Sequence, residues 1–249
     1  MTTNKEHRPG QQAQQPKSTL ITGASSGIGG AIALKMLNYG VDVTGIGRDF
    51  SNCQYASFAD QFTKVELDLS DLDSLPTCLS QDARFNQSFD CLILNAGYGQ
   101  FGGIEQFSYQ QIRRLIDTNL VSNLFLLKYF LPAFKQNKGG DIVLIGSESA
   151  YSGAKQGAVY CASKFAIRGL AQSLRADCAK SGIRVLLVNP GPTDTDFFDD
   201  LHFTPENGAD YSINPDSVAQ SIWDALQLPP TTVIEELNIQ PIKRAFRKK

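Results

Sequence analysis

The apolar residues of this chain occur in two patterns, short unbroken runs and longer stretches with apolar positions every three or four residues. Short runs rich in β-branched residues predict strands, whereas the longer spacing predicts helices that bury one face. The predicted strands are Ser18–Thr22, Asp42–Ile46, Lys64–Leu67, Cys91–Asn95, Asp141–Ile145, Arg184–Asn189 and Thr232–Ile239. The predicted helices lie near Gly27–Tyr39, Leu72–Gln81, Ser108–Lys135, Gly157–Lys180 and Pro215–Gln227.

The predicted strands and helices alternate along the chain, and the strands show little internal alternation of apolar and polar residues. This is typical of a mainly parallel sheet that helices cover on both faces. We therefore expect one doubly wound α/β domain with seven strands over residues 18–242. Residues 1–17 are rich in Gln, Pro and Lys and predict a disordered tail. Residues 243–249 carry five basic side chains and predict a solvated tail.

The composition of the 249 residues excludes several kinds of protein. A net charge of −2 gives no reason to expect a nucleic-acid partner, and the longest apolar runs are too short for membrane insertion. No secretory signal is visible, and the five cysteines are scattered, which predicts free thiols and a cytoplasmic location. Only two histidines are present, so we expect no metal centre.

A possible acid–base pair lies on the fourth predicted helix. Tyr160 and Lys164 are four residues apart, which places them on one helix face, and Ser147 lies upstream after an apolar run. A phenol titrates near pH ~10 in water, and a nearby ammonium lowers that pKa toward a range useful for proton transfer. The Ser147 hydroxyl would hold a substrate oxygen beside the phenol. The same spacing is also common in ordinary amphipathic helices, so it is not decisive by itself.

A glycine-rich turn follows the first predicted strand and precedes the first helix. Free N–H groups and the helix dipole make such a turn an anion site. Gly23 would permit the turn, Gly27 would allow a pyrophosphate to approach, and Gly29 would allow the helix to pack closely on the strand. These features predict a dinucleotide site.

The same residues also fit a hydrolase motif. Gly23–Gly27 reads Gly-x-Ser-x-Gly, in which Ser25 would be the nucleophile and His202, the only downstream histidine, its base. This alternative leaves Tyr160 and Lys164 unexplained, and such an elbow does not normally follow the first strand.

Taken together, these residues resemble the short-chain dehydrogenase/reductase family over Ser18–Ile242. The matching motifs are TGASSGIG at Thr22–Gly29, Asp68, Asn95-Ala96-Gly97, Asn119, Ser147, Tyr160, Lys164, Asn189-Pro190-Gly191 and Thr195. The resemblance implies a Rossmann-type fold and hydride transfer between a nicotinamide cofactor and a carbonyl or secondary alcohol. It also implies a homodimer or homotetramer formed through the Ser108–Lys135 and Gly157–Lys180 helices.

The resemblance assigns roles to individual residues. Tyr160 is the implied general acid/base, Ser147 stabilises the substrate oxygen, Lys164 lowers the Tyr160 pKa and holds the ribose, and Asn119 organises a proton relay. The implied cofactor-binding residues are Gly23, Ser25, Ser26, Gly27, Ile28, Gly29, Arg48, Asp68, Leu69, Asn95, Ala96, Gly97, Tyr160, Lys164, Pro190, Gly191, Thr193 and Thr195. Simpler interpretations remain for three of these residues. Asp68 can cap a turn, Asn119 can be a surface amide, and Asn95 can be an ordinary turn former.

The end of the second predicted strand bears on the choice of cofactor. NAD enzymes place an acidic residue there, whereas this chain has Gly47 followed by Arg48. Glycine leaves room for a 2′-phosphate and Arg48 can bind it, so NADP(H) is favoured over NAD(H). Asp49 is the competing residue, because a shift of register would bring it near the ribose.

The substrate remains open at this point. Gly146-Ser147 and the segment LPPTTVIEELNIQPI resemble the branch that oxidises serine and other 3-hydroxy acids, with Lys155 or Arg113 as possible carboxylate ligands. Phe197–Tyr211 is predicted to form a lid over the substrate. Three aromatic side chains are expected either in the pocket or in the core: Tyr98, Phe101 and Tyr151. An apolar ketone or aldehyde therefore remains an alternative substrate. A non-catalytic NADP(H)-binding regulatory protein on the same fold is the alternative function.

Overall fold

The computed structural model describes residues 15–51 and 53–249. Most of the tail expected over residues 1–17 therefore lies outside the described residues. Of the part that is described, the Lys17 N–H donates to the Asp90 carboxylate at 2.9 Å. The side chain of Gln15 donates to the carbonyl of Tyr39 at 2.8 Å.

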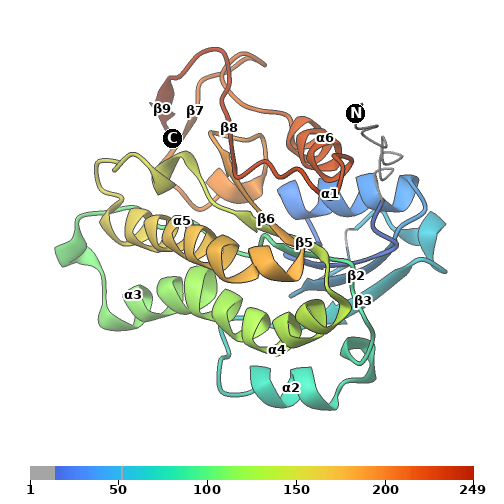
Figure 1. Ribbon diagram of the computed structural model, residues 1–249. Helices are drawn as coiled ribbons and strands as arrows, with labels where there is room; N and C mark the ends of the chain where they lie inside the picture. Colours follow the sequence, from blue (N-terminus) through green and yellow to red (C-terminus); the bar gives the residue numbers. More distant parts are fainter. Residues whose placement is uncertain (1–14, 52) are drawn as a thin grey trace, which may run out of the picture.

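A parallel sheet forms the centre of the fold (Figure 1). Its seven strands run in the order β3-β2-β1-β4-β5-β6-β8, and every neighbouring pair is parallel. They are β1 Ser18–Thr22, β2 Asp42–Gly47, β3 Phe62–Glu66, β4 Cys91–Leu94, β5 Gly140–Ile145, β6 Ile183–Pro190 and β8 Glu236–Ile239. This confirms the predicted fold class. The order reverses between β1 and β4, which is where ligands bind in such sheets.

The last strand of this sheet is shorter than the sequence predicts. It starts at Glu236 instead of Thr232. The carbonyls of Thr232 and Glu235 accept hydrogen bonds from the guanidinium groups of Arg184 and Arg175. Side chains therefore help to anchor this segment, and the first backbone bond to β6 is that of the Leu187 N–H to the carbonyl of Glu235 at 3.1 Å.

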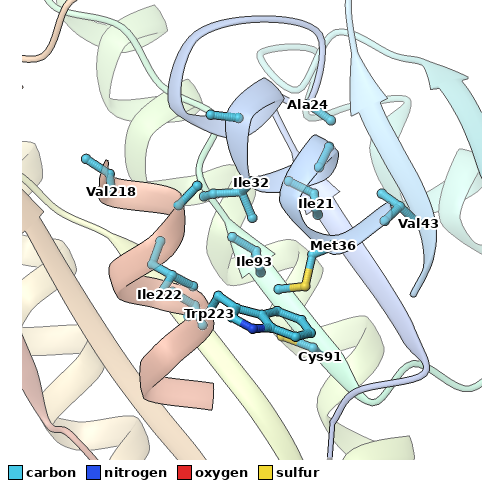
Figure 2. Packing of buried hydrophobic residues seen from close by; sticks show 14 of the residues in the cluster. Ile21, Ala24, Ile32, Met36, Val43, Cys91, Ile93, Val218, Ile222 and Trp223 are labelled. Atoms are coloured by element: carbon cyan, nitrogen blue, oxygen red, sulfur yellow. The ribbon is translucent and has the colours of Figure 1, made fainter. Parts of the chain in front are cut away.

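Helices cover both faces of the sheet and bury a core on each (Figure 1). Helices α1 (Gly27–Asn38) and α6 (Pro215–Leu226) lie on one face, and α2 (Leu75–Gln81), α4 (Ser122–Asn137) and α5 (Ala158–Cys178) on the other. Successive strand residues point to opposite faces, so Leu20 joins one core and Ile21 the other. Figure 2 shows the core under α1 and α6, where Trp223 lies beside Met36 and Cys91. No helix in the described part of the chain is long and apolar enough to cross a membrane.

The helix predicted over Ser108–Lys135 is interrupted. Helix α3 covers Tyr109–Ile116, a π-helical turn covers Asp117–Val121, and α4 follows. A π-turn inserts an extra residue into the helix and is often found at functional sites. Here it contains Asn119, whose side chain is buried.

A second, antiparallel pair of strands was not predicted. Strand β7 (Phe203–Pro205) pairs with β9 (Phe246–Lys248), and the two lie together beyond the main sheet in Figure 1. Part of the basic segment expected as a solvated tail over residues 243–249 is therefore a strand. The segment is exposed, but its backbone is bound to the segment expected as the lid: the Glu206 N–H donates to Ala245 at 3.0 Å and the Lys243 N–H to Asp210 at 2.9 Å.

A buried ion pair joins the starts of β5 and β6. The Arg184 guanidinium donates to both carboxylate oxygens of Asp141, at 2.6 and 2.9 Å. Burial raises the pKa of Asp141, and the pairing with Arg184 opposes that shift. Arg184 also donates to the carbonyls of Leu226 and Leu228, at 3.0 and 2.8 Å, which fixes the end of α6 to the sheet.

Candidate active site

The glycine turn lies between β1 and α1, at the carboxyl end of the sheet. Gly23 and Gly27 have φ angles of +66° and +54°, which L side chains rarely adopt. A Cβ on Gly29 would lie 2.0 Å from the Gly23 carbonyl oxygen, so only glycine allows this packing of helix on turn. The backbone here has the form that dinucleotide binding requires.

Asn95 holds this turn in place from the neighbouring strand. Its side-chain nitrogen donates to the carbonyls of Thr22 and Gly23, at 3.0 and 3.2 Å. In return, the Thr22 hydroxyl accepts from the N–H groups of Asn95 and Ala96, each at 2.9 Å. Asn95 is therefore more than a turn former, because it fixes β4 to the glycine turn at the point where strand order reverses.

Ser147, Tyr160 and Lys164 meet at the carboxyl end of β5. Ser147 follows that strand, and Tyr160 and Lys164 lie in the first turns of α5; all three are buried. The Ser147 hydroxyl accepts from the Ser149 N–H at 3.1 Å and lies near enough to the Tyr160 phenol to influence its pKa. The Lys164 Nζ donates to the carbonyl of Ile145 at 3.0 Å and lies 5.9 Å from the centroid of the Tyr160 ring.

The proton affinities of these groups differ from the sequence-based expectation. Burial raises the pKa of Tyr160 to about 12, while the Ser147 hydroxyl opposes the rise and the charge of Glu148 adds to it. Burial also lowers the pKa of Lys164 to about 8. Loss of water around the phenol thus outweighs the nearby ammonium, which is bonded to Ile145. The expected lowering of the Tyr160 pKa is not met in this geometry.

Asn119 is a buried linker and not a surface amide. Its side chain accepts from the N–H of Tyr98 and donates to the carbonyl of the same residue, both at 3.0 Å. It also donates to the Ser163 hydroxyl on α5 at 3.2 Å. The π-turn therefore holds the loop after β4 against the helix that carries Tyr160 and Lys164. Asn119 does not line the cavity itself.

One cavity of about 630 Å³ connects these features. Of the site residues predicted from sequence, the ones that line it are Gly23, Ser25, Ser26, Gly27, Ile28, Arg48, Asp68, Leu69, Asn95, Ala96, Gly97, Ser147, Tyr160, Lys164, Pro190, Gly191, Thr193 and Thr195. Gly29 and Asn119 lie behind the wall. The cavity runs from the glycine turn, past the Ser147–Tyr160 pair, to the strands β7 and β9.

The end of the cavity near β2 bears on the cofactor. Arg48 lines it, whereas Asp49 does not and instead binds the N–H and hydroxyl of Ser51, at 2.8 and 3.0 Å. A Cβ at Gly47 would lie 3.0 Å from both the Phe50 ring and the Ser25 hydroxyl, so an acidic side chain here would have to displace one of them.

Asp68 and Arg114 lie on the opposite side of the same end. The Asp68 carboxylate accepts from the N–H and hydroxyl of Ser70, at 2.9 and 2.8 Å, so it does cap a turn. Burial opposes its ionisation, but Ser70, Arg114 and Arg48 together lower its pKa. Arg114 lines the cavity and was missed by the sequence analysis, which named Arg113. The Arg113 side chain is 83% exposed and points to Asp117 at 3.5 Å.

The substrate end contains residues that the sequence did not suggest. Phe101, Tyr98 and Lys155 line it as expected, but Tyr151 does not; its hydroxyl accepts from Gln240 at 2.9 Å. The additional lining residues include Glu148, Arg244 and Phe246. The last two come from the segment expected to be solvated, and no sequence signal placed them near Tyr160.

The residues present fit a nicotinamide dinucleotide. The glycine turn offers backbone N–H groups to a pyrophosphate, Arg48 and Asp68 lie at one end, and Tyr160 and Lys164 at the other. Across the described ranges 15–51 and 53–249, no cluster of His, Cys, Asp or Glu could hold a metal ion.

Comparison with known proteins identifies the family. The family model described as short chain dehydrogenase matches residues 17–205. The chain belongs to the short-chain dehydrogenase family. An uncharacterized oxidoreductase of Staphylococcus saprophyticus is 30% identical over 234 residues, which cover 92% of this chain and 98% of that protein.

Solved structures of other dehydrogenases have a similar fold. An alcohol dehydrogenase from the archaeon Thermococcus sibiricus, complexed with 5-hydroxy-NADP, superposes with a TM-score of 0.81 at 25% identity, covering 92% of this chain and 98% of that one. Escherichia coli serine dehydrogenase superposes at 0.75 with 24% identity, covering 89% and 96%. At that identity the likeness concerns the fold alone and does not decide the branch. Family membership sets the hydrolase alternative aside, and Ser25 belongs to the glycine turn.

Proposed function

We propose that this protein is an NADP(H)-dependent oxidoreductase that interconverts a carbonyl and a secondary alcohol. The observation that carries the proposal is the burial of Ser147, Tyr160 and Lys164 in the same cavity as the glycine turn. A phenol and a serine hydroxyl that line the same part of one cavity can both reach one substrate oxygen. A family member without catalysis would have no need to keep these groups together.

The chain's own residues would move the proton and hold the substrate. Ser147 orients the substrate oxygen, and Tyr160 gives it a proton during reduction or takes one during oxidation. Lys164, fixed by Ile145, places a positive charge next to the phenol and the ribose position. Asn119 keeps the loop at Tyr98 closed over these groups. The nicotinamide, when bound, supplies or accepts the hydride.

The preference for NADP(H) over NAD(H) rests on the end of β2. Arg48 lines the cavity and the residue before it, Gly47, has no side chain, so a 2′-phosphate would meet a guanidinium group and no acidic group there. Asp49, the residue that would favour NAD, is turned toward Ser51. The complex of the Thermococcus sibiricus enzyme with 5-hydroxy-NADP supports the same choice.

The test is turnover of the wild type and Tyr160→Phe, followed by NADPH absorbance with a panel of ketones, aldehydes and alcohols. We expect the variant to lose about 10²- to 10⁴-fold in kcat, because the general acid is removed, while its Kd for NADPH stays close to wild type. Undiminished turnover in Tyr160→Phe would contradict the mechanism. NADPH binding without turnover of any compound would favour the regulatory alternative.

A further inference from the structure

Aromatic side chains enclose the substrate end of the cavity. Starting from Tyr160, ring centroids follow one another at 5.2, 5.1, 5.6, 6.4, 5.1 and 6.0 Å. The rings in that order are Tyr160, Phe101, Phe203, Phe246, Phe198 and Phe197, and the last contact returns to Tyr160. We call these six residues the aromatic circuit. Such a wall favours a flat, apolar substrate body.

Two elements far apart in sequence complete the circuit. Phe203 belongs to β7 and Phe246 to β9, so their positions depend on the pairing of these strands. Around them, Lys243 binds Asp210 at 2.9 Å, Arg247 binds Asn207 at 3.1 Å, and Lys249 binds the carbonyl of Asp199 at 3.0 Å. Residues 243–249 therefore hold Phe246 in its place in the aromatic circuit.

A charged side chain, that of Glu148, lies next to the apolar residues of the aromatic circuit. Glu148 directly follows Ser147 and lines the cavity. One of its carboxylate oxygens accepts from Arg244 at 2.9 Å, whereas the other, Oε2, is buried without a hydrogen-bond partner. A buried carboxylate oxygen left unsatisfied is costly, and a small rotation of the Glu148 carboxylate toward the cavity, where a donor can reach Oε2, would relieve this cost.

The negative charge of Glu148 acts on the Tyr160 phenol. It raises the pKa of Tyr160, which agrees with a carboxylate near the phenol. A second negative group on the substrate, next to the reacting carbon, would be repelled there, whereas a hydroxyl or amine would supply the donor that Oε2 lacks.

We propose that Glu148, held by Arg244, binds a hydrogen-bond donor next to the reacting carbon of a substrate whose apolar ring fills the aromatic circuit. The substrate class is an aryl or cyclic ketone with an adjacent hydroxyl or amine, or the corresponding alcohol. The inference rests on the proposed function and deepens it. It disfavours 2-oxo acids and 2-hydroxy acids, whose carboxylate is attached directly to the reacting carbon and would lie near Glu148.

Four matched ketones test this assignment with NADPH: acetophenone, its 2-hydroxy and 2-amino derivatives, and benzoylformate. For the wild type we expect kcat/KM at least about tenfold higher for the hydroxy or amino ketone than for acetophenone, and lowest for benzoylformate. Whichever of these two ketones has the larger increase in kcat/KM over acetophenone shows whether the site prefers a hydroxyl or an amine. Glu148→Leu should reduce the advantage to within about twofold, and Glu148→Gln should relieve the penalty on benzoylformate. Glu66→Gln, an exposed glutamate outside the cavity, is the control and should keep the wild-type ratios.

A binding measurement separates this inference from the proposed function. Calorimetry in the Tyr160→Phe background compares 1-phenyl-1,2-ethanediol with 1-phenylethanol, and adding Glu148→Leu should remove the diol's advantage. Turnover with ratios that Glu148→Leu does not change would overturn the inference alone. The absence of any turnover in the wild type would count against the proposed function, and calorimetry would still decide the role of Glu148. If benzoylformate is the best wild-type substrate and Arg244→Gln loses it, Arg244 binds a carboxylate and the inference is wrong.

Discussion

The ammonium of Lys164 donates to the carbonyl of Ile145 at 3.0 Å, which ties helix α5 to the end of strand β5. The lysine is thereby held beside Tyr160 without bonding to its hydroxyl, and the ring centroid lies 5.9 Å from Nζ. A backbone carbonyl of the sheet therefore fixes the position of the Lys164 ammonium. The consequence is a buried amine that is expensive to keep charged.

This burial makes stability depend on pH. Lys164 has a pKa of about 8 in the folded chain against 10.5 for the free group, so below pH 8 both states are protonated and the full cost of burial is present. Between pH 8 and pH 10.5 the native state has released the Lys164 proton while the unfolded state retains it, so the free energy of unfolding rises with pH. We expect Lys164→Met to be more stable than wild type at pH 7, with that advantage falling by about 2 kcal/mol at pH 9.5.

Urea unfolding of both proteins at the two pH values measures this difference. Comparing variant with wild type cancels the titration of other groups, and the range stops below the region where Tyr160 matters, since its raised pKa affects stability only above pH 10. A constant difference between pH 7 and 9.5 would show that Lys164 titrates normally.

Arg48 is expected to decide the choice of cofactor. Arg48→Leu should lower kcat/KM for NADPH roughly tenfold to hundredfold, because a charged hydrogen bond to the 2′-phosphate is lost, and should leave the value for NADH nearly unchanged. Steady-state kinetics with both cofactors measure this. Asp49→Asn is the matched control, since Asp49 points to Ser51, and an equal loss in that variant would implicate the wrong residue.

The Asp141–Arg184 pair should be important for stability. Asp141→Asn leaves Arg184 buried without its counter-charge, and we expect a loss of about 3–5 kcal/mol in the free energy of unfolding. Glu66→Gln, which breaks the exposed pair with Lys64, should cost less than about 1 kcal/mol. Replacing both Asp141 and Arg184 by leucine should recover much of the loss. Chemical denaturation measures all three, and equal costs for the two single variants would contradict this account.

Phe246 is expected to affect substrate binding and leave cofactor binding intact. Phe246→Ala opens the aromatic circuit far from the glycine turn, so KM for an aryl ketone should rise about tenfold while the Kd for NADPH stays the same. Kinetics and cofactor titration of the same preparations separate the two effects. Lys248→Ala, in the same strand but outside the cavity, should resemble wild type. Weaker NADPH binding in Phe246→Ala would point to a general loss of folding.

The sequence was sufficient for the main sheet because its central strands are buried on both faces. The runs around Leu20, Ile93 and Val143 contain enough apolar and β-branched residues to predict strands, and the alternating helices imply parallel pairing. The glycine turn and Tyr160 were also predictable, since local chemistry requires those residue types at those positions.

The features that sequence missed depend on contacts between distant residues. Strands β7 and β9 have three residues each, contain a proline or several basic side chains, and are stable only as a pair. The π-turn at Asn119 has no local signature, and whether Arg113 or Arg114 faces the cavity depends on the rotation of α3. The raised pKa of Tyr160 follows from burial, which the spacing of Tyr160 and Lys164 does not reveal.

The paired strands β7 and β9 share no hydrogen-bonded neighbour with the seven-stranded sheet. Substitutions in them therefore leave the ladder, the glycine turn and the Asn95 contacts intact. A lineage can exchange the walls around the substrate while retaining the machinery that holds the nucleotide. Selection for a new substrate would then be expected to alter residues 203–205 and 246–248 before it reaches the core.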